Sequence, residues 1–435
     1  MDYRKVKNCR ICGSKRLKQY LDLGLAPLPN DLCMNGESHK NYPLQVLFCE
    51  DCSLSQLSVV VNPEIMFRNY PYHSSTSETF KKHCYLLGKK LFRMIKRSSL
   101  TVIDIAANDG CLLEQFANTG FYWRLVGVEP AKNLSALCIR KGLRVENEFF
   151  SIKTSVPQSD VITAANVLAH VDDLDEFITA IKFNLSARSK SICVVEVPYL
   201  PDLIERNAFD TIYHEHLSYF LLKPLKQLFE NHGMRIFKAE RIKIHGGSLR
   251  IFTCLQFYRN NDNALRVYFP NPIIDRAFME PWLTVDSRNL FREDKSVQKL
   301  LKFEEDGGFY ELDVYRDFSG RLSGIQSKFR NLLMDLKNRG KLVAGYGASA
   351  KGIMMLNACK IGSEHLAYIV DDTPGKQGYF IPGSRIPIVS AERFHVEKPD
   401  YIALLSWNFS KELMRKTKKI GARYIVAIPE AVILN

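Results

Sequence analysis

One segment of this chain reads as strand, turn, helix and strand, and it constrains the fold more than any other feature. Residues 100–106 (LTVIDIA) form a β-branched apolar run, followed by a polar turn at 107–110 (ANDG) and a helical pattern over 111–117. A second apolar run, 125–128, ends in Glu129. This order predicts the first unit of a doubly wound α/β sheet. An acidic residue after the second strand can accept both ribose hydroxyls of an adenosyl group.

The next strand continues the same pattern. Residues 160–164 (DVITA) form a third apolar run, and Asn166 and His170 follow it at the edge of the sheet where cofactors bind. The turn at 107–110 carries only Gly110, so it matches the dinucleotide fingerprint GxGxxG poorly. A Rossmann unit for another adenine cofactor is the alternative.

Two CxxC pairs stand near the N-terminus, Cys9 with Cys12 and Cys49 with Cys52. Four thiolates in two such pairs match a tetrahedral, structural zinc site, which leaves no open position for catalysis. Zinc here would hold together a segment of about 60 residues that has little core of its own. Cys33 lies between the pairs as a weaker candidate ligand. Free thiols spaced by chance are the alternative.

A second strand–turn–helix unit occurs near the C-terminus. Residues 342–345 (LVAG) form a short strand, and 346–352 (YGASAKG) form a turn of small residues that opens a helix. Bare backbone amides, Ser349 and Lys351 at a helix N-terminus suit a phosphate. The spacing is not that of a P-loop, so ATP hydrolysis is not expected. A tight turn with glycine only for packing is the alternative.

The densest group of chemically active side chains is the segment 213–216 (YHEH), which follows an apolar run at 192–197. A tyrosine, a glutamate and two histidines this close together can remove a proton, hold a metal or stabilise an oxyanion. The structural alternative is a polar helix start whose imidazoles cap or pair locally.

Composition sets the outer limits. A chain of 435 residues with 46% hydrophobic and 25% charged residues is long enough for two or three globular domains. The N-terminus lacks the apolar core of a signal peptide and no run has the length of a membrane span, so we expect a cytoplasmic protein with reduced thiols. The net charge is +13, but its basic residues are spread along the chain, so a dedicated nucleic-acid surface is not indicated.

Taken in order, these motifs resemble the sugar C-methyltransferases, which use S-adenosylmethionine (SAM) and act on nucleotide-linked 4-keto-deoxysugars. The matching segments are the two CxxC pairs, NDG at 108–110, EHLSYF at 215–220, HGGSLR at 245–250, GYGASAKG at 345–352, VDDTPGKQG at 370–378 and SWNF at 406–409. The resemblance covers nearly the whole chain. It departs over residues 263–295, which look longer than the usual connection and would alter the substrate rim or an interface.

The resemblance implies an α/β protein of three domains with one connecting insertion. We expect a zinc-binding module (1–66), a Rossmann-like SAM-binding methyltransferase domain (67–262), a connecting insertion (263–300) and a second Rossmann-like, nucleotide-sugar domain (301–435). The substrate should lie in the cleft between the two larger domains.

The expected site residues fall into two binding groups. For the cofactor these are Asp104, Ala106, Asn108 and Gly110 on the methionine side, Glu129 at the ribose, and Phe149, Phe150 and Asn166 around the adenine and the methyl group. For the substrate these are Ala348, Ser349 and Lys351 at the phosphates, assisted by Arg250, and His245 as a further contact.

Methylating a sugar carbon requires a carbanion equivalent, and a neighbouring ketone makes that C–H acidic. His216 is the expected base, because an imidazole titrates near neutrality. Tyr213 is expected to donate to the enolate oxygen, and Glu215 to orient an imidazole or hold a sugar hydroxyl. Tyr72 and His170 are expected to reach the active site, and with His214 they are the next candidates for the base.

The expected function is therefore SAM-dependent C-methylation, at C3, of a dTDP- or GDP-linked 4-keto-6-deoxysugar. The expected protein is a monomer or homodimer without nucleic-acid or membrane partners. An O- or N-methyltransferase of another small molecule, a non-enzymatic zinc-and-Rossmann binding module and an RNA methyltransferase are the alternatives.

Overall fold

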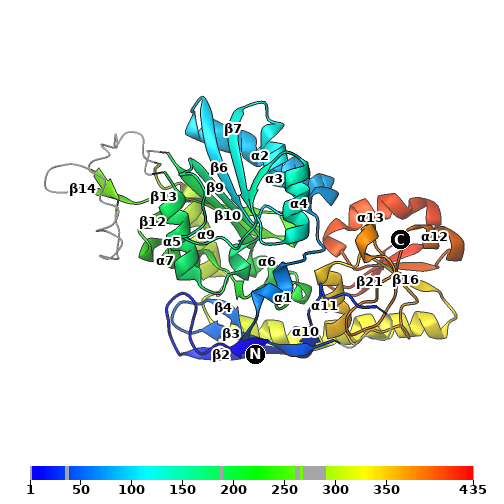
Figure 1. The fold of residues 1–435 in the computed structure, drawn as a ribbon. Coiled ribbons are helices and arrows are strands. Elements are labelled where there is room, and N and C mark those ends of the chain that lie inside the picture. Colours follow the sequence, from blue (N-terminus) through cyan, green and yellow to red (C-terminus); the bar gives the residue numbers. More distant parts are fainter. Residues whose placement is uncertain (1, 35–38, 187–189, 260–264, 268–290, 435) are drawn as a thin grey trace.

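A computed structural model describes residues 2–34, 39–186, 190–259, 265–267 and 291–434. Figure 1 shows an N-terminal module, a central domain and a C-terminal domain, with the long helix α10 (Leu312–Asn338) running beneath. The predicted insertion at 263–300 lies mostly outside the described residues, and α9 (Lys295–Asp306) crosses its end. Within the described ranges, no helix has the length and apolar character needed to cross a membrane.

The N-terminal module is built on antiparallel strands, and its main sheet has the order β11-β4-β3-β2. These strands are β2 (Leu17–Pro27), β3 (Asn41–Cys49), β4 (Ser55–Leu57) and β11 (Ser218–Tyr219), while β1 (Tyr3–Lys5) pairs with β5 (Val59–Val61) and α1 (Pro63–Phe67) follows. Strand β11 comes from far along the chain and places Ser218 opposite Gln56. The segment after the Tyr-His-Glu-His motif therefore belongs to the sheet of this module.

The central domain has a seven-stranded sheet in the order β12-β13-β10-β9-β6-β7-β8. The strands are β6 (Ser99–Ile105), β7 (Tyr122–Val128), β8 (Arg144–Glu146), β9 (Val161–Ala165), β10 (Ile192–Pro198), β12 (Met234–Ile242) and β13 (Ser248–Leu255). The helices are α2 (Glu78–Ile95), α3 (Cys111–Ala117), α4 (Lys132–Arg140), α5 (Leu174–Asn184), α6 (Leu200–Glu205) and α7 (Leu222–Asn231). A separate hairpin pairs β14 (Phe257–Arg259) with β15 (Leu265–Val267).

Strand order reverses between β6 and β9, which lie side by side and parallel. The strands from β8 to β10 are parallel, and β13 is antiparallel to both of its neighbours. The central strands are apolar runs without alternation because helices bury both faces of the sheet. A switch point of this kind leaves a crevice outside the carboxyl ends of the two strands, where ligands bind.

The C-terminal domain repeats this plan with the order β18-β17-β16-β19-β20-β21, in which only the edge strand β21 is antiparallel. Its elements are β16 (Val343–Tyr346), α11 (Ala350–Ala358), β17 (Ile369–Val370), β18 (Ile388–Val389), α12 (Glu392–Glu397), β19 (Tyr401–Leu404), α13 (Ser410–Thr417), β20 (Arg423–Val426) and β21 (Val432–Leu434). Its switch point lies between β16 and β19. The predicted architecture, two Rossmann-like α/β domains with a small N-terminal module, is confirmed.

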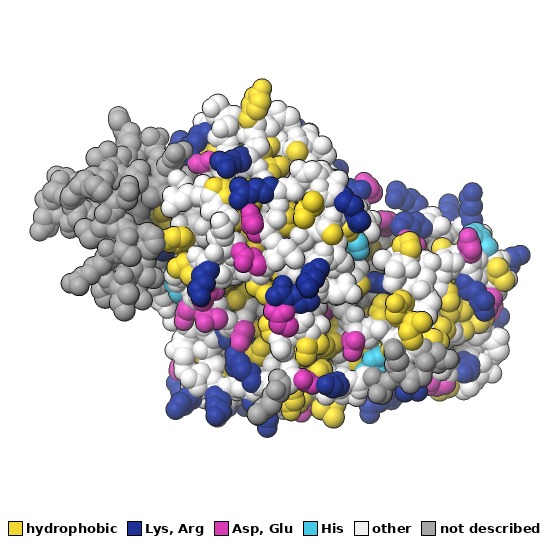
Figure 2. Space-filling view, in the orientation of Figure 1, with side chains coloured by type: hydrophobic (Ala, Val, Ile, Leu, Met, Phe, Trp, Pro, Cys, Tyr) yellow, Lys and Arg dark blue, Asp and Glu magenta, His cyan; other side chains and the backbone are white. Residues whose placement is uncertain are grey.

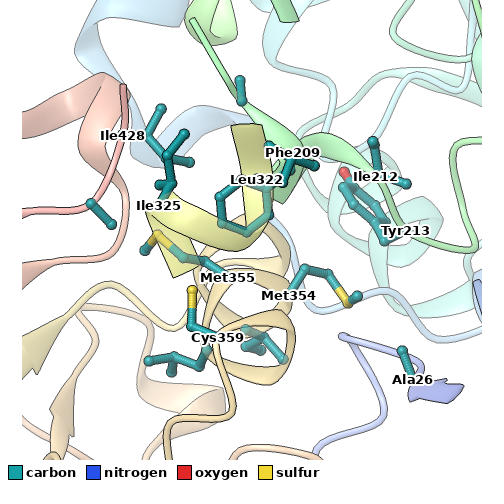
Figure 3. Close-up of a cluster of buried hydrophobic side chains, with 14 of the residues drawn as sticks. Ala26, Phe209, Ile212, Tyr213, Leu322, Ile325, Met354, Met355, Cys359 and Ile428 are labelled. Carbon is teal, nitrogen blue, oxygen red and sulfur yellow. The ribbon is translucent and has the colours of Figure 1, made fainter. Parts of the chain in front are cut away.

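One apolar cluster runs through all three parts. Figure 3 shows Ala26 of the N-terminal module and Phe209 and Tyr213 of the central domain near Leu322 of α10 and Met354 of α11. These side chains are buried together, so the segment that carries the Tyr-His-Glu-His motif is fixed from both sides. Burial of shared apolar area, rather than a flexible linker, sets how the parts meet.

Candidate active site

A cavity of about 480 Å³ lies where the carboxyl ends of both sheets converge. Its lining includes Ala106 after β6 and Asn166 after β9, at the switch point of the central sheet. It also includes Ser349 after β16 and Ser406 after β19, at the switch point of the C-terminal sheet. The two crevices expected from the topology therefore open into one space, and Asn30 contributes to it from the N-terminal module.

The carboxylate of Glu129 lies at the end of β7 and lines the cavity. It accepts the backbone N–H of Asn108 at 2.7 Å and that of Ala131 at 2.8 Å. Burial raises the pKa of Glu129 to about 7, although both N–H groups act in the opposite direction. Phe149 and Phe150 also line the cavity and offer an apolar wall for a base. These groups fit the ribose and adenine of an adenosyl cofactor.

Three non-glycine residues that line the cavity adopt left-handed backbone conformations, with φ of 58° at Ala106, 54° at Asn108 and 57° at Asn166. Each follows a central strand directly or by a short turn. A left-handed φ costs a non-glycine residue about 1–2 kcal/mol, so the surrounding structure must hold these turns. Glycine would adopt the left-handed conformation of Ala106 without this cost.

Two predicted cofactor residues lie behind the lining. Asp104 is buried and accepts the hydroxyl of Thr163 at 2.7 Å, and burial raises the pKa of Asp104 to about 7. Gly110 caps α3 with φ of 80°, and a side chain there would lie 2.3 Å from Leu143. Both support the turn that carries Asn108, and neither borders the cavity.

Tyr213 and His216 both line the cavity, and their hydrogen bonds define the state of the imidazole. His216 Nδ1 lies 2.7 Å from the carbonyl oxygen of Thr211, which can only accept. Nδ1 therefore carries a proton. Burial lowers the pKa of His216 well below its ordinary 6.5, so the ring is neutral and Nε2 is an acceptor. The Tyr213 hydroxyl, 3.0 Å away, donates to Nε2.

The ring of His170 stacks between two others in the same wall. Its centroid lies 5.1 Å from that of His216 and 5.5 Å from that of Phe67. Burial lowers the pKa of His170 to about 4, and its Nε2 has no hydrogen-bond partner among the described residues. His170 thus offers an unused polar atom beside the cavity.

Glu215 lies just behind the cavity lining and accepts hydrogen bonds from two side chains that border the cavity. Tyr70 donates its hydroxyl to Oε2 at 2.7 Å, and Asn30 donates its amide to Oε1 at 2.6 Å. Burial raises the pKa of Glu215 to about 7. Tyr72 also borders the cavity, while His214 instead lies 3.2 Å from the carbonyl of Pro43 in the N-terminal module.

The C-terminal domain contributes the opposite wall. Ser349 caps α11 by accepting the N–H of Gly352 at 3.2 Å. Lys351 is directed across the domain boundary, where Nζ donates to the carbonyl of His245 at 2.7 Å. Both lysine and histidine line the cavity. Ala348 is buried behind it, with its N–H donated to Asp371 at 2.7 Å.

The structure does not place Arg250 at the cavity. It is buried on β13, and its Nε donates to Glu196 on β10 at 2.5 Å. Burial would raise the pKa of Glu196, but His83 and Arg250 hold it at about 2. A guanidinium engaged by this carboxylate inside a sheet cannot turn toward a phosphate, because the partner would be left as an unpaired buried charge.

Several cavity residues had no assigned role in the sequence analysis. These are Asn30, Phe67, Lys376, Ser406, Asn408 and Phe409. Lys376, Ser406, Asn408 and Phe409 belong to segments that resemble the sugar C-methyltransferases, which was the available signal. Asn30 stands in a polar loop without a motif, so nothing in the sequence could have singled it out.

The four predicted zinc ligands are together at one end of the N-terminal module. The sulfur atoms of Cys9, Cys12, Cys49 and Cys52 all lie within 4.8 Å of one another. Cys9 and Cys52 are 3.4 Å apart, and Cys12 and Cys49 are 3.6 Å apart. A tetrahedral zinc with bonds of about 2.3 Å needs sulfurs about 3.8 Å apart. The cluster fits one structural zinc ion. Cys33 lies elsewhere, where its backbone forms an isolated antiparallel β-bridge with Phe380.

The sheet order, the carboxylate after β7 and the cavity at the switch point fit a SAM-dependent methyltransferase, and the cysteine cluster fits a zinc module. Three family models match the protein in chain order. They are described as "Putative zinc binding domain" (residues 9–67), "Methyltransferase domain" (79–239) and "C-methyltransferase C-terminal domain" (282–429). C-methyltransferase NovU of Streptomyces niveus is 31% identical over 448 positions, covering 99% of this chain and 98% of that protein. The chain belongs to this family of C-methyltransferases.

Solved structures resemble part of this chain more distantly. A SAM-dependent methyltransferase of Clostridium acetobutylicum aligns with a TM-score of 0.33 and 9% identity, covering 42% of this chain and 94% of that one. Magnesium protoporphyrin IX methyltransferase of Synechocystis, with bound SAM, aligns with a TM-score of 0.31 and 11% identity over 40% and 79%.

Proposed function

We propose that this enzyme methylates C3 of a nucleotide-linked 4-keto-6-deoxysugar. One observation carries the proposal: a single cavity holds the adenosyl-type site, a neutral histidine with its tyrosine, and two lysines, of which Lys376 is buried and Lys351 half-buried. A sugar nucleotide needs cationic groups for its diphosphate and a base beside the carbon to be methylated. The cavity supplies both kinds of group on opposite domains.

The chemistry demanded of the protein is proton removal. The ketone at C4 makes the C3 proton acidic, and its removal moves the C–H electron pair into a C3=C4 bond and the carbonyl π pair onto O4. SAM, when bound, supplies the electrophilic methyl group and leaves as S-adenosylhomocysteine. The protein must hold C3, its base and the oxygen in place while excluding water.

His216 is the proposed base, acting with Tyr213. Nε2 carries no proton and accepts a hydrogen bond from the Tyr213 hydroxyl. The pair can therefore pass a proton from the cavity to the imidazole. The proton from C3 reaches the tyrosine oxygen as the tyrosine proton moves to Nε2, and the Thr211 carbonyl stabilises the imidazolium that results. Burial disfavours this charged ring, which favours release of the proton to solvent after methyl transfer.

Lys351 and the N-terminus of α11 are proposed to hold the diphosphate. Helix α11 begins at Ala350 with Ser349 as its cap, at the switch point where α/β sheets bind ligands. Burial lowers the pKa of Lys351, and the buried carboxylate of Asp210 acts against this. An arriving diphosphate would add negative charge and stabilise the protonated amine.

The direct test uses purified enzyme with SAM and either dTDP- or GDP-4-keto-6-deoxysugars. Mass spectrometry should find a product heavier by one methyl group, and NMR should place that group on C3. In deuterated water without SAM, the enzyme should exchange the C3 proton. Methylation on oxygen or nitrogen, with no C3 exchange for any of these substrates, would reject the proposal in favour of an O- or N-methyltransferase.

A further inference from the structure

Arg10 stands between two of the zinc ligands, Cys9 and Cys12, and its side chain is only 4% exposed. The backbone of this knuckle is fixed to β4, because the N–H of Arg10 donates to Gln56 Oε1 at 3.0 Å and the Gln56 amide donates to the carbonyl of Asn8 at 3.1 Å. A buried guanidinium needs acceptors close by, since an unpaired charge inside a protein is costly. The partners of Arg10 therefore show what the knuckle is joined to.

The partners of the Arg10 side chain come from distant parts of the chain. Its Nη1 donates to the carbonyl oxygen of Leu217 at 3.1 Å, and its Nε donates to Asp172 Oδ1 at 3.4 Å. Both partners line the cavity, whereas Arg10 itself does not. The guanidinium thus joins two segments of the cavity wall from behind, without entering the space that a ligand would fill.

Each partner is next to one of the two stacked imidazoles. Leu217 directly follows His216, and Asp172 follows His170 by two residues. The ring centroids of His170 and His216 lie 5.1 Å apart, with 30° between the ring planes. Both hydrogen bonds of the His216 ring come from within residues 211–213, so they hold the ring to its own segment and not to the opposite one. A guanidinium bound to both segments limits how far one ring can move from the other.

We propose that Arg10 is a positioning residue that holds His216, the proposed base, at its place in the cavity. This inference rests on the function proposed above. Arg10 contacts no reacting atom and acts by tying Leu217 to Asp172. Zinc, when bound, holds the knuckle from which Arg10 extends. A displacement of about 1 Å at a catalytic group can cost about 10²-fold in rate, so the knuckle affects catalysis through geometry alone.

The competing explanation is that Arg10 only stabilises the N-terminal module. Arg10→Met keeps an unbranched apolar side chain and removes both hydrogen bonds of the guanidinium. Asp172 keeps its ion pair with Arg4, so this variant leaves no isolated carboxylate. Arg10→Lys keeps the charge but loses the planar fork of donors that reaches both acceptors.

Arg16→Met is the matched control. Arg16 also lies beside the zinc ligands, where its Nη1 is 2.6 Å from Oδ1 of Asp51, a residue between Cys49 and Cys52. Its side chain is exposed and does not line the cavity. Zinc content and thermal melting report whether the module of each variant remains folded. We expect the wild type and all three variants to bind the same amount of zinc.

The first measurement does not depend on catalysis. In protein with isotope-labelled histidine, NMR follows the Nδ1–H of His216, and His216→Asn identifies its signal. This proton should exchange slowly with solvent, because it is donated to the Thr211 carbonyl inside a buried segment. We expect exchange to be about tenfold faster in Arg10→Met, because the segment opens more readily, and unchanged in Arg16→Met.

The second measurement is C3 proton exchange in deuterated water without SAM, at saturating sugar nucleotide. We expect Arg10→Met to lower this exchange and kcat by about tenfold or more, with KM and SAM affinity within about threefold of wild type. Arg10→Lys should fall between Arg10→Met and the wild type, and Arg16→Met should match the wild type. A role in folding alone would instead lower SAM binding and exchange together.

Three results would overturn the inference. Wild-type kcat with wild-type Nδ1–H protection in folded Arg10→Met would show that the base is held without Arg10. Loss of zinc with equal losses of SAM binding and exchange would make Arg10 a stabilising residue only. Equal effects of Arg16→Met would assign the loss to the module as a whole. If the wild type shows no C3 exchange, the proposed function fails, but faster Nδ1–H exchange in Arg10→Met would still support positioning of His216 by Arg10.

Discussion

The Tyr213 hydroxyl lies 3.0 Å from Nε2 of His216. The hydrogen bond of the other ring nitrogen, Nδ1, shows whether tyrosine or histidine donates in this pair. Nδ1 lies 2.7 Å from the Thr211 carbonyl, so it must be the protonated nitrogen. Tyrosine is then the donor and histidine the acceptor. A pair arranged in this way can take a proton from a substrate, whereas an imidazolium could not.

His216→Asn should lower kcat by about 10²–10⁴-fold and abolish C3 exchange, because the acceptor at Nε2 is lost. Tyr213→Phe should lower exchange too, since it removes the hydroxyl through which the proton passes. His214→Asn is the control, because that ring contacts Pro43 and not the cavity. Its exchange rate should stay within about tenfold of wild type. Exchange by His216→Asn at the wild-type rate would exclude this histidine as the base.

The pH dependence of SAM binding should report on Glu129. Its pKa is raised to about 7 by burial, so the carboxyl is increasingly neutral below that pH. Only the carboxylate can accept both ribose hydroxyls, so SAM affinity should rise as the pH increases through about 7 and then level off. Calorimetric titration across this range measures the effect.

Glu129→Gln should bind SAM more weakly by roughly 1–3 kcal/mol above that pH and lose the dependence. The control is Glu148→Gln, an exposed change in the loop after β8, which should leave both unaltered. Equal pH dependence in wild type and Glu129→Gln would assign the effect to another group.

Ala106→Gly should be tolerated unusually well. At φ of 58° the alanine is strained by about 1–2 kcal/mol, and glycine relieves this while costing about 0.5–1 kcal/mol in the unfolded chain. The free energy of unfolding should be unchanged or rise by up to about 1 kcal/mol. Ala136→Gly, at an exposed position within α4, should lower it by about 1 kcal/mol. Urea denaturation of both variants tests the contrast, and equal losses would refute strain at Ala106.

Trp407 should stabilise the contact between the domains. Its Nε1 donates to the buried Asp210 at 2.8 Å, and the other oxygen of that carboxyl has no hydrogen-bond partner within the described part of the chain. Trp407→Phe should cost about 1–3 kcal/mol in unfolding free energy, because Asp210 would be left without this donor. In Trp123→Phe, a donor to the Thr119 hydroxyl at 3.0 Å is lost instead. We expect Trp123→Phe to lower the free energy of unfolding less than Trp407→Phe does. Denaturation curves in which Trp123→Phe costs more would contradict this.

The net positive charge of the chain does not come from one concentrated basic surface on the face shown in Figure 2. On the face shown in Figure 2, Lys and Arg side chains are scattered among Asp and Glu rather than gathered in one area. Two lysines, Lys351 and Lys376, line the cavity, where Lys376 is buried and Lys351 half-buried. A net charge of +13 cannot identify them, because it counts every exposed cation equally.

Local patterns in the sequence determined the parts of this protein that depend on nearby residues. The strand, turn and helix around Asn108 follow from neighbouring side chains, as does the position of Glu129 after its strand. The two CxxC pairs predicted the zinc ligands because each knuckle is itself a local turn. In all of these, the interacting residues are close in the chain or repeat a pattern with known spacing.

Only the tertiary structure decided how those parts combine. Asn30, Glu215 and Lys376 come from three parts of the chain and meet because one apolar cluster packs the domains together. The same packing turned Arg250 inward, where pairing with Glu196 avoids an isolated buried charge. Burial also set the protonation state of His216, since desolvation depends on everything packed around the ring. None of these outcomes has a local signature, because each depends on contacts between residues far apart in the sequence.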